Sequence, residues 1–201
     1  MLFIELFAPQ GRLDADRRRK IAKGFLTAVA GTGDEGEAAP DPRSMAVFRS
    51  YFHVVVHEPE TWVVGEDLVG ADGPVPYLVR VQLPGSWRKD LSAHVIPEFT
   101  RVIVDADPGA AVQVQVLGVS EGSFGIRGEA VSSDRIVELM NEPVQQELAE
   151  GRSVVDPMCG VIVPLATAPV LEWEGTLYGF CCEGCLQEFV AKKEKEAARA
   201  G

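Results

Sequence analysis

Cysteine, histidine and long apolar runs are all scarce in this sequence. The first 158 residues contain no cysteine, and the whole chain has only three histidines. A membrane-spanning helix needs roughly 18 apolar residues, whereas the longest apolar run, VIVPLATAPVL, is shorter and is interrupted by prolines. The opening residues MLFIELF lack the basic flank of a secretory signal. We therefore expect a cytoplasmic protein that makes no use of a membrane.

Positive charge is also in short supply. The chain has 19 Lys and Arg against 30 Asp and Glu, for a net charge of −11. Broad binding to nucleic acid needs a basic face, and so does binding to an anionic membrane, so both partners are excluded as expectations. The composition is 46% hydrophobic and 24% charged, as in ordinary globular proteins, and 201 residues allow one domain plus a small module.

The four cysteines lie together near the C-terminal end. Cys159 stands in DPMCG, and Cys181, Cys182 and Cys185 stand in FCCEGC. In a reducing compartment such clusters more often bind a metal or carry redox chemistry than form disulfides. Two ligands on a tight turn and a third from a separate segment are a common way to hold a soft metal. We expect Cys159, Cys181 and Cys185 to bind Zn²⁺ or Cu⁺. Thiolate ligands suit these two ions about equally well.

Cys182 is a less certain ligand. Neighbouring cysteines rarely both point at one ion, so the fourth ligand is either Cys182 or another group. Cys182 and Cys185 also form a CxxC, which is the spacing of a redox pair or a zinc knuckle. A purely structural zinc and a redox role therefore remain alternatives.

The tail at residues 152–201 is small for an independent domain. A unit of this size usually needs a metal, disulfides or a partner to fold. Its last part, CLQEFVAKKEKEAARA, predicts a helix with Leu186, Phe189 and Val190 on its apolar face. A metal in this tail would therefore serve folding first.

The tail resembles the YHS domain of the TRASH treble-clef group. The resemblance rests on the cysteine spacing and the residues around it, which are Asp156, Pro157, Cys159, Gly160, Tyr178, Phe180, Cys181, Cys185 and Phe189. It implies a metal-binding module of the kind often attached to metal transporters, metal sensors or oxygenase subunits.

The remainder of the chain reads as two similar halves. MLFIELFAPQ and PYLVRVQLPGSW each predict a strand followed by a turn, about 76 residues apart. Each is followed by a predicted helix, the first capped by Asp14 and the second containing Pro97 as a kink or late start. FHVVVHEPETW and VQVQVLGVSEGSFGIRGEA then predict a second strand in each half. The first and second strands of the two halves do not repeat at one constant offset. A polar loop from Gly31 to Ser44 explains this difference as an insertion in the first half.

This order predicts an α/β (α+β) fold of two β-α-β units. The two units would share one four-stranded sheet backed by two helices, with one face left uncovered and available for oligomerisation. We expect this domain at residues 1–131, a helical connector that bends near Pro143 at 132–151, and the metal-binding tail at 152–201.

The tandem pattern resembles the fused, two-repeat form of the tautomerase superfamily. The resemblance covers residues 1–131 and rests on the strand at the N-terminus, the basic helix, and the match of HVVVHEPETWVVGED to VQVQVLGVSEGSFGIRG. It implies a trimeric assembly. It also implies catalysis by an N-terminal proline, whose secondary amine acts as base or nucleophile.

That proline is missing. The sequence begins Met1-Leu2, leucine is too large for the usual removal of methionine, and the nitrogen of Pro76 is a tertiary amide. The Met1 amine could act as a weak base, since its ordinary pKa is about 7.7–8.0. Arg80 is a candidate for carboxylate binding and His53 for proton transfer.

Three further side chains have possible roles in such catalysis. Arg101 could bind a carboxylate, and His57 and Glu58 could move protons. His53 and His57 alternate on one strand face with Val55, so burial or a subunit contact explains them equally well.

Three functions therefore remain open. The first is a metal-binding protein with a tautomerase-like scaffold that has lost proline-based catalysis. The second is a tautomerase-like isomerase of small carboxylated enol or keto substrates with a structural zinc. The third is an accessory subunit of a metalloenzyme.

Overall fold

A computed structural model describes residues 2–30, 40–69 and 75–200. The contacts divide the chain into two compact units. The first unit comprises residues 1–32 and 51–133, and the second comprises residues 33–50 and 134–201. In the described part of the chain, no helix combines the length and apolar character needed to cross a membrane.

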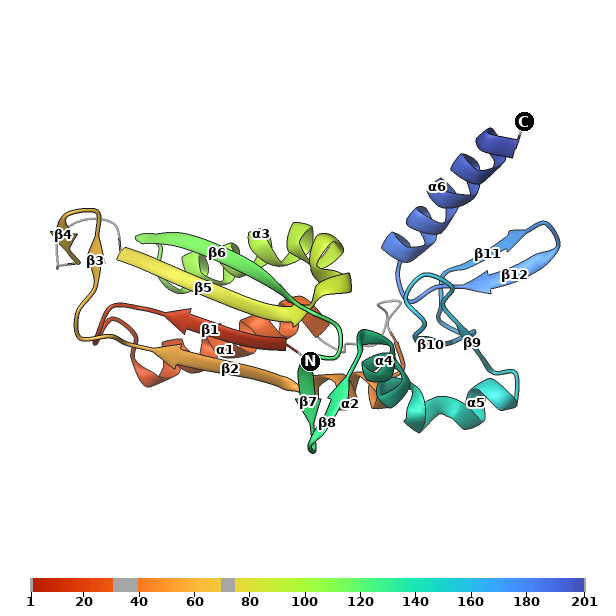
Figure 1. Ribbon diagram of the computed structural model, residues 1–201, viewed down its shortest axis with the longest axis horizontal. Helices are drawn as coiled ribbons and strands as arrows, with labels where there is room; N and C mark the ends of the chain where they lie inside the picture. The colour runs from red at the N-terminus through yellow and green to blue at the C-terminus, as the bar shows by residue number, and fades with distance from the viewer. Residues whose placement is uncertain (1, 31–39, 70–74, 201) are drawn as a thin grey trace. The chain divides into compact units, whose positions relative to one another are not determined.

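The first unit is built on a four-stranded mixed sheet (Figure 1). Its strands are β1 (Leu2–Phe7), β2 (Phe52–His57), β5 (Val75–Pro84) and β6 (Ala110–Val119), in the order β2-β1-β5-β6. β1 is parallel to β2 and β5 is parallel to β6, while the central pair β1 and β5 is antiparallel. The predicted fold of two β-α-β repeats sharing one sheet is confirmed.

Strict alternation along the strands separates a covered face from an open face. Leu2, Ile4 and Leu6 of β1 are fully buried, whereas the residues between them are only partly buried. Successive side chains of a strand point to opposite faces, so the alternating sequence places all three apolar residues on one side. The same face carries the buried side chains of β5, namely Tyr77, Val79, Val81 and Leu83.

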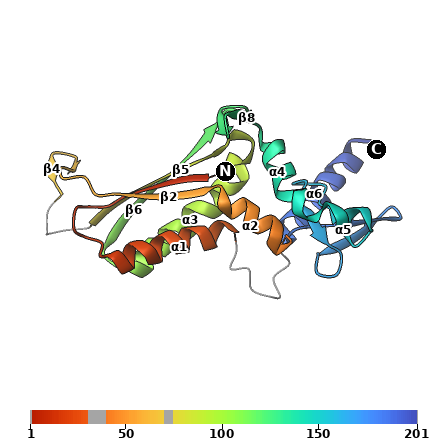
Figure 2. The same cartoon turned by 90° about the horizontal axis from the view of Figure 1, so that it is seen from below.

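Helices α1 (Ala15–Ala30) and α3 (Arg88–Ala106) cover that face (Figure 2). The rings of Phe25 and Phe99 stack between them with centroids 4.3 Å apart. The helices approach closely at Gly24, where an added Cβ would lie 2.7 Å from Val102 Cγ1. Both helices thus close the core over the sheet.

The starts of these helices have different causes. Asp14 Oδ1 accepts a hydrogen bond of 2.7 Å from the Arg17 amide, so the predicted cap is confirmed. A short 3₁₀ turn, η1 (Gly85–Trp87), leads into α3, which begins at Arg88 and contains Pro97. A late start of α3 at Pro97, one of the two alternatives, is therefore wrong.

A small hairpin follows the second strand of each repeat. The first consists of β3 (Val63–Val64) and β4 (Asp67–Leu68), and the second of β7 (Phe124–Ile126) and β8 (Glu129–Val131). The corresponding hairpins strengthen the case for a tandem duplication.

Helix α2 (Pro42–Ser50) corrects the predicted polar loop. Residues 31–39 of that loop lie outside the described residues, but residues 42–44 are helical. Asp41 Oδ1 accepts a 2.8 Å hydrogen bond from the Arg43 amide, and proline at the first helical position costs no hydrogen bond. This start signal lies within a polar segment and was not recognised from the sequence.

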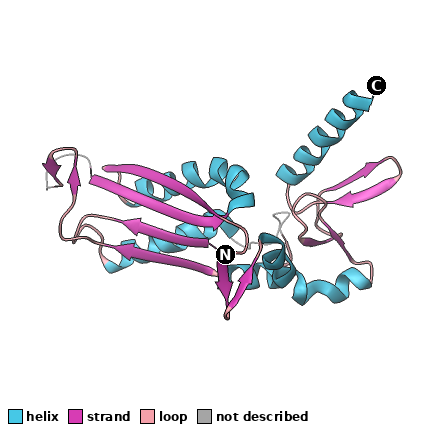
Figure 3. Cartoon of the chain, in the orientation of Figure 1, coloured by secondary structure: helices cyan, strands magenta, loops and turns pink. Residues whose placement is uncertain are grey.

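The rest of the second unit consists of short helices and two hairpins, followed by the long helix α6 (Glu183–Ala200) (Figure 3). The predicted helical connector is α4 (Ser133–Asn141), η2 (Glu142–Val144) and α5 (Gln145–Ala149), and its break near Pro143 is confirmed. Two hairpins and a last helix follow: β9 (Ser153–Val155), β10 (Ile162–Pro164), β11 (Val170–Trp173), β12 (Thr176–Gly179) and α6 (Glu183–Ala200).

Helix α2 belongs to this second unit although its sequence lies between elements of the first. It packs against η2. The Arg43 guanidinium donates a 2.8 Å hydrogen bond to Glu147 Oε1 of α5, across 104 residues of sequence. Met45 and Phe48 of α2 are buried, each with 8% exposure. The second unit is thus discontinuous in sequence.

Candidate metal centre

The first cysteine lies on a tight loop between β9 and β10. The two strands are antiparallel, with Val155 opposite Ile162. The loop is closed by hydrogen bonds from the Asp156 amide to the Val161 carbonyl and from the Gly160 amide to the Asp156 carbonyl, both of 2.9 Å. Gly160 has φ of +76°, which glycine adopts without strain. Local backbone geometry therefore presents Cys159 at the turn.

The other cysteines follow the β11–β12 hairpin. β12 ends at Gly179, and an added Cβ there would lie 2.4 Å from Val154 Cγ2, so glycine permits the close approach of β12 to β9. Phe180 is fully buried and packs on Phe189 of α6, with ring centroids 5.3 Å apart. This packing fixes the segment that carries Cys181 and begins α6.

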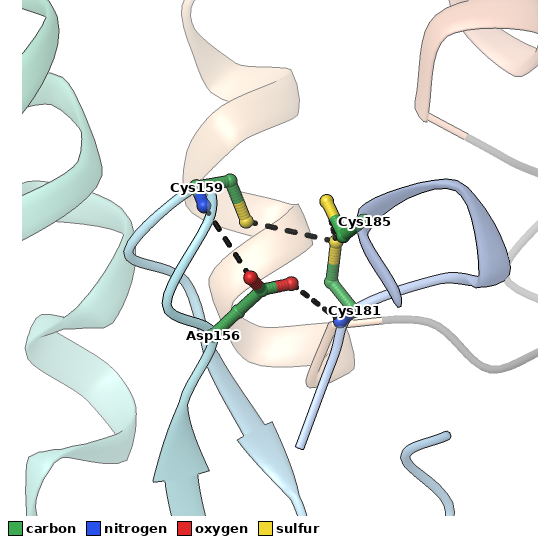
Figure 4. A group of neighbouring side chains, drawn as sticks. All are labelled: Asp156, Cys159, Cys181 and Cys185. Atoms are coloured by element: carbon green, nitrogen blue, oxygen red, sulfur yellow. Dashed lines mark hydrogen bonds between the residues drawn. The ribbon is translucent and has the colours of Figure 1, made fainter. Parts of the chain in front are cut away.

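Three thiols from the two segments converge (Figure 4). Cys181 Sγ lies 3.6 Å from Cys159 Sγ and 3.5 Å from Cys185 Sγ. With an Asp156 oxygen they form one group whose potential ligand atoms all lie within 4.8 Å of one another. The structure therefore brings together all three predicted ligands.

These separations fit a thiolate metal site. A tetrahedral ion with metal–sulfur bonds of about 2.3 Å places its sulfurs about 3.8 Å apart. The two measured separations are only slightly shorter than that. The three thiols are half-buried and thus reachable from solvent. The donor set is soft, as Zn²⁺ and Cu⁺ both require.

The thiols also compete for protons. Hydrogen bonds shared with the thiols of Cys181 and Cys185 lower the pKa of Cys159 to about 5. The same contact with Cys159 raises the pKa of Cys181, and hydrogen bonds with Cys182 and Cys185 add to that rise. One thiolate forms readily, but further thiolates beside it need a positive charge. A cation is the natural complement of this group.

Asp156 links the two cysteine-bearing segments. Its side chain is fully buried. Oδ1 accepts hydrogen bonds from the amides of Met158, at 2.8 Å, and Cys159, at 3.4 Å. Oδ2 accepts one from the Cys181 amide at 2.7 Å (Figure 4). The sequence placed Asp156 in the motif but gave no role for it. An aspartate that bonds the amide two residues on is a typical turn signal, which could have located its first contact.

Asn141, at the end of α4, holds the Cys159 loop from another side. Its amide nitrogen donates a 2.8 Å hydrogen bond to the Gly160 carbonyl. Its side-chain oxygen accepts one of 2.9 Å from the Ile162 amide. Both contacts span about 20 residues of sequence, and nothing in the sequence indicated them.

Cys182 is placed differently from the other three thiols. It is exposed, and its Sγ lies 3.8 Å from Cys181 Sγ. It is not a member of the group formed by Asp156 and the other cysteines. The structure thus places the least certain of the predicted ligands at the edge of the site.

Three of the catalytic candidates, His53, His57 and Arg80, lie on the open face of the sheet. Arg80 Nη1 is 3.6 Å from Glu5 Oε2, and the guanidinium lies over the Phe7 ring at 5.4 Å. His57 Nε2 is 3.2 Å from Glu5 Oε1, and its ring stacks on Phe7 at 4.5 Å. Sequence reasoning missed Glu5, whose only signal is a carboxylate in an otherwise apolar strand. The candidates Arg80 and His57 therefore both lie at ion-pair distance from Glu5.

The other candidates do not join this cluster as a catalytic set. His53 is exposed and contacts Phe3, with ring centroids 6.2 Å apart. Glu58 pairs with Arg18 at 2.6 Å. Arg101 pairs with Glu98 and Asp105 on the surface of α3. Met1 lies outside the described residues.

A shallow apolar groove of about 270 Å³ adjoins this face. It is lined by Phe7, Pro59, Thr61, Trp62, Val63 and Leu78. Trp62 directly precedes β3 and contributes to this lining.

Known proteins resemble this chain in two separate regions, the tail by sequence family and the remainder by structure. The YHS domain family matches residues 154–199, so the chain carries a YHS domain. The structure is similar to N1, a member of the cis-3-chloroacrylic acid dehalogenase family, with 14% identity over 74% of this chain and 99% of that protein and a TM-score of 0.50. At this identity the likeness shows the fold alone.

Two other solved structures are similar. The F6 fused 4-OT, an asymmetric trimer, has 15% identity over 64% of this chain and 94% of its own, with a TM-score of 0.48. Macrophage migration inhibitory factor of Toxoplasma gondii has 14% identity over 62% of this chain and 96% of its own, with a TM-score of 0.45. No curated protein shows significant sequence similarity to the chain.

Proposed function

We propose that the YHS domain of this chain binds one soft metal ion, Zn²⁺ or Cu⁺, through Cys159, Cys181 and Cys185. The observation that carries the proposal is the convergence of three thiols from two segments, with sulfur separations of 3.5 and 3.6 Å. When bound, such an ion supplies the positive charge that three neighbouring thiolates need. A reducing compartment such as the cytoplasm would keep these thiols free.

The test is metal analysis of the full chain purified without chelator or added metal. We expect about one equivalent of a single soft metal per chain. Single changes of Cys159, Cys181 or Cys185 to serine should each reduce this occupancy sharply. Protein that stays free of metal after incubation with Zn²⁺ and with Cu⁺ would overturn the proposal.

We further propose that the first unit is a tautomerase-like scaffold without proline-based catalysis. Met1 directly precedes β1, and the first proline of the sequence is Pro9. Pro76 lies inside β5, paired with Ala111, and its amide nitrogen is not basic. Purified protein should show no ketonisation of 2-hydroxymuconate or phenylenolpyruvate above the rate in buffer. Turnover that disappears when the N-terminus is blocked would make Met1 a working base.

We also propose that the chain forms a homotrimer through its first unit. The open sheet face carries apolar side chains that remain accessible in a single chain, including Val55 at 37% exposure and Leu117 at 43%. The fused 4-OT, a structure with a similar layout, is itself a trimer. Light scattering coupled to gel filtration should give three times the chain mass of 21.7 kDa. A monomeric mass would contradict this part.

A further inference from the structure

The buried carboxylate of Asp156 joins the two segments that carry the thiols. It is 0% exposed, and its two oxygens accept amide hydrogen bonds from different segments. One oxygen fixes the turn at Cys159, and the other holds the Cys181 backbone at 2.7 Å. These bonds fix the backbone positions from which two of the three thiol side chains extend.

Binding a metal directly would conflict with this arrangement. A carboxylate ligand has to turn a lone pair toward the ion, with an oxygen–metal distance of about 2.0–2.2 Å. Oδ2 of Asp156 is committed to the Cys181 amide, and turning it away would leave that half-buried donor without its acceptor. A fourth anion beside three thiolates would also add charge repulsion.

Among the described residues of the second unit, no other His, Cys, Asp or Glu side chain joins this group. Cys182 is exposed and lies outside the group of converging side chains. The three histidines of the chain, at positions 53, 57 and 94, all belong to the first unit. The set of ligands supplied by the second unit therefore stops at three thiolates.

We propose that Asp156 is a positioning residue and not a ligand, so that a small soft donor from outside the chain, a thiolate or an imidazole, completes the coordination of the metal. This inference rests on the proposed metal binding. It gives the site the character of an exchange site, because structural zinc sites are closed by four protein ligands, whereas open sites retain a replaceable one.

Co²⁺ is a suitable probe, because its visible absorption reports the number of bound thiolates and the coordination geometry. We expect the full chain to bind Co²⁺ through three thiolates, and its spectrum to shift when imidazole or 2-mercaptoethanol is added. Asp156→Asn keeps the shape but replaces one acceptor oxygen by an amide group. It should weaken Co²⁺ binding about 10–100-fold. At saturating Co²⁺ its spectrum should equal that of the unmodified chain.

Cys182→Ser is the matched control, since it changes a neighbouring residue without touching the hydrogen bonds of Asp156. It should leave both the spectrum and the affinity unchanged. Hydrogen exchange of residues 154–163 in the metal-free proteins separates positioning from unfolding, and Asp156→Asn should increase exchange there while the first unit stays protected.

Three results would overturn the inference. One is a spectrum of the unmodified chain that does not respond to either added donor and loses an oxygen ligand in Asp156→Asn. The second is a four-sulfur spectrum that loses one sulfur in Cys182→Ser. The third is unchanged affinity in Asp156→Asn. Failure of the unmodified chain to bind Co²⁺ at all would remove the proposed metal binding together with this inference.

Discussion

The two units differ in the kinds of side chain that they bury. The first unit closes over a continuous apolar core, in which the alternate residues of β1 and β5 meet Ile21, Phe25, Val95, Phe99 and Ile103 of the helices. The second unit has a smaller apolar core and contains four of the five polar residues that are buried among those the structure describes, namely Ser44, Asn141, Ser153 and Asp156. The fifth, Asp107, belongs to the first unit.

The difference teaches what each unit depends on. Apolar burial is non-directional, so the first unit tolerates changes of shape and needs no added group. The second unit relies on a few directed hydrogen bonds and on its thiols, and each of these is lost completely when one partner is removed. A mutation in one unit should therefore destabilise that unit and leave the other unchanged.

The largest effect should come from the metal ligands. Cys159→Ser, Cys181→Ser or Cys185→Ser should release the metal and loosen the second unit, while the first unit stays folded. Structural zinc in small peptides contributes about 10–16 kcal/mol, more than any other single interaction available here. Limited proteolysis combined with metal quantification measures both parts. Cys182→Ser serves as control, and equal metal loss in all four variants would make Cys182 a ligand.

Phe25→Ala tests the opposite case. Removing a buried ring that stacks on Phe99 should reduce the free energy of unfolding of the first unit by about 3–5 kcal/mol, through lost burial and the cavity left behind. Metal content per folded chain should not change. Denaturant unfolding followed together with metal release checks this, and a parallel loss of metal affinity would show that the two units are not separable.

Asn141→Ala should destabilise the second unit by about 2–4 kcal/mol. It leaves the Gly160 carbonyl and the Ile162 amide without their partners, at about 1–3 kcal/mol for the buried Ile162 amide and about 1 kcal/mol for the half-buried Gly160 carbonyl. Gln146→Ala is the matched control, because that side-chain amide bonds Glu150 on the surface. Hydrogen exchange at residues 159–163 is the measurement, and equal protection in both variants would contradict the role given to Asn141.

The smallest effect concerns acid stability of the first unit. The guanidinium of Arg12 is bound to Asp107 at 2.8 and 2.9 Å and lowers the pKa of that carboxyl to about 2, with a further hydrogen bond from Tyr77. A depressed folded-state pKa stabilises the fold above the unfolded-state pKa, and this contribution disappears as pH falls from about 4 to about 2.

Arg12→Ala should therefore flatten the decrease in thermal stability of the first unit between pH 4 and pH 2. Arg101→Ala removes surface ion pairs, including the one with Glu98 that lowers the pKa of that carboxyl, and because solvent screens these pairs it should change the profile much less. Thermal melts across this pH range provide the comparison, and identical profiles for Arg12→Ala and the unmodified chain would contradict it.

Local patterns carried the predictions that succeeded. The alternation in β1 and β5 predicted the sheet, since period 2 dictates which side chains share a face. The spacing of Cys181 and Cys185 puts both on one turn, whereas Cys159 reaches them from a separate segment.

What the sequence could not give depends on tertiary packing. Glu5 is tied to Arg80 only through the pairing of β1 with β5, and Asn141 to Gly160 only through the position of α4. Helix α2 was missed because Asp41 and Pro42 signal a start within a polar segment with few apolar residues. These contacts join residues that no local pattern relates.

The position of α2 in the second unit has a consequence for synthesis of the chain on the ribosome. Met45 and Phe48 emerge early, but η2 and α5, against which α2 packs, come roughly 100 residues later. At about 5–20 residues per second, the apolar side of α2 stays without its native cover for about 5–20 s. During that interval the sheet of the first unit can assemble. A nascent chain stalled before residue 142 should therefore be the form most prone to aggregate and most dependent on chaperones.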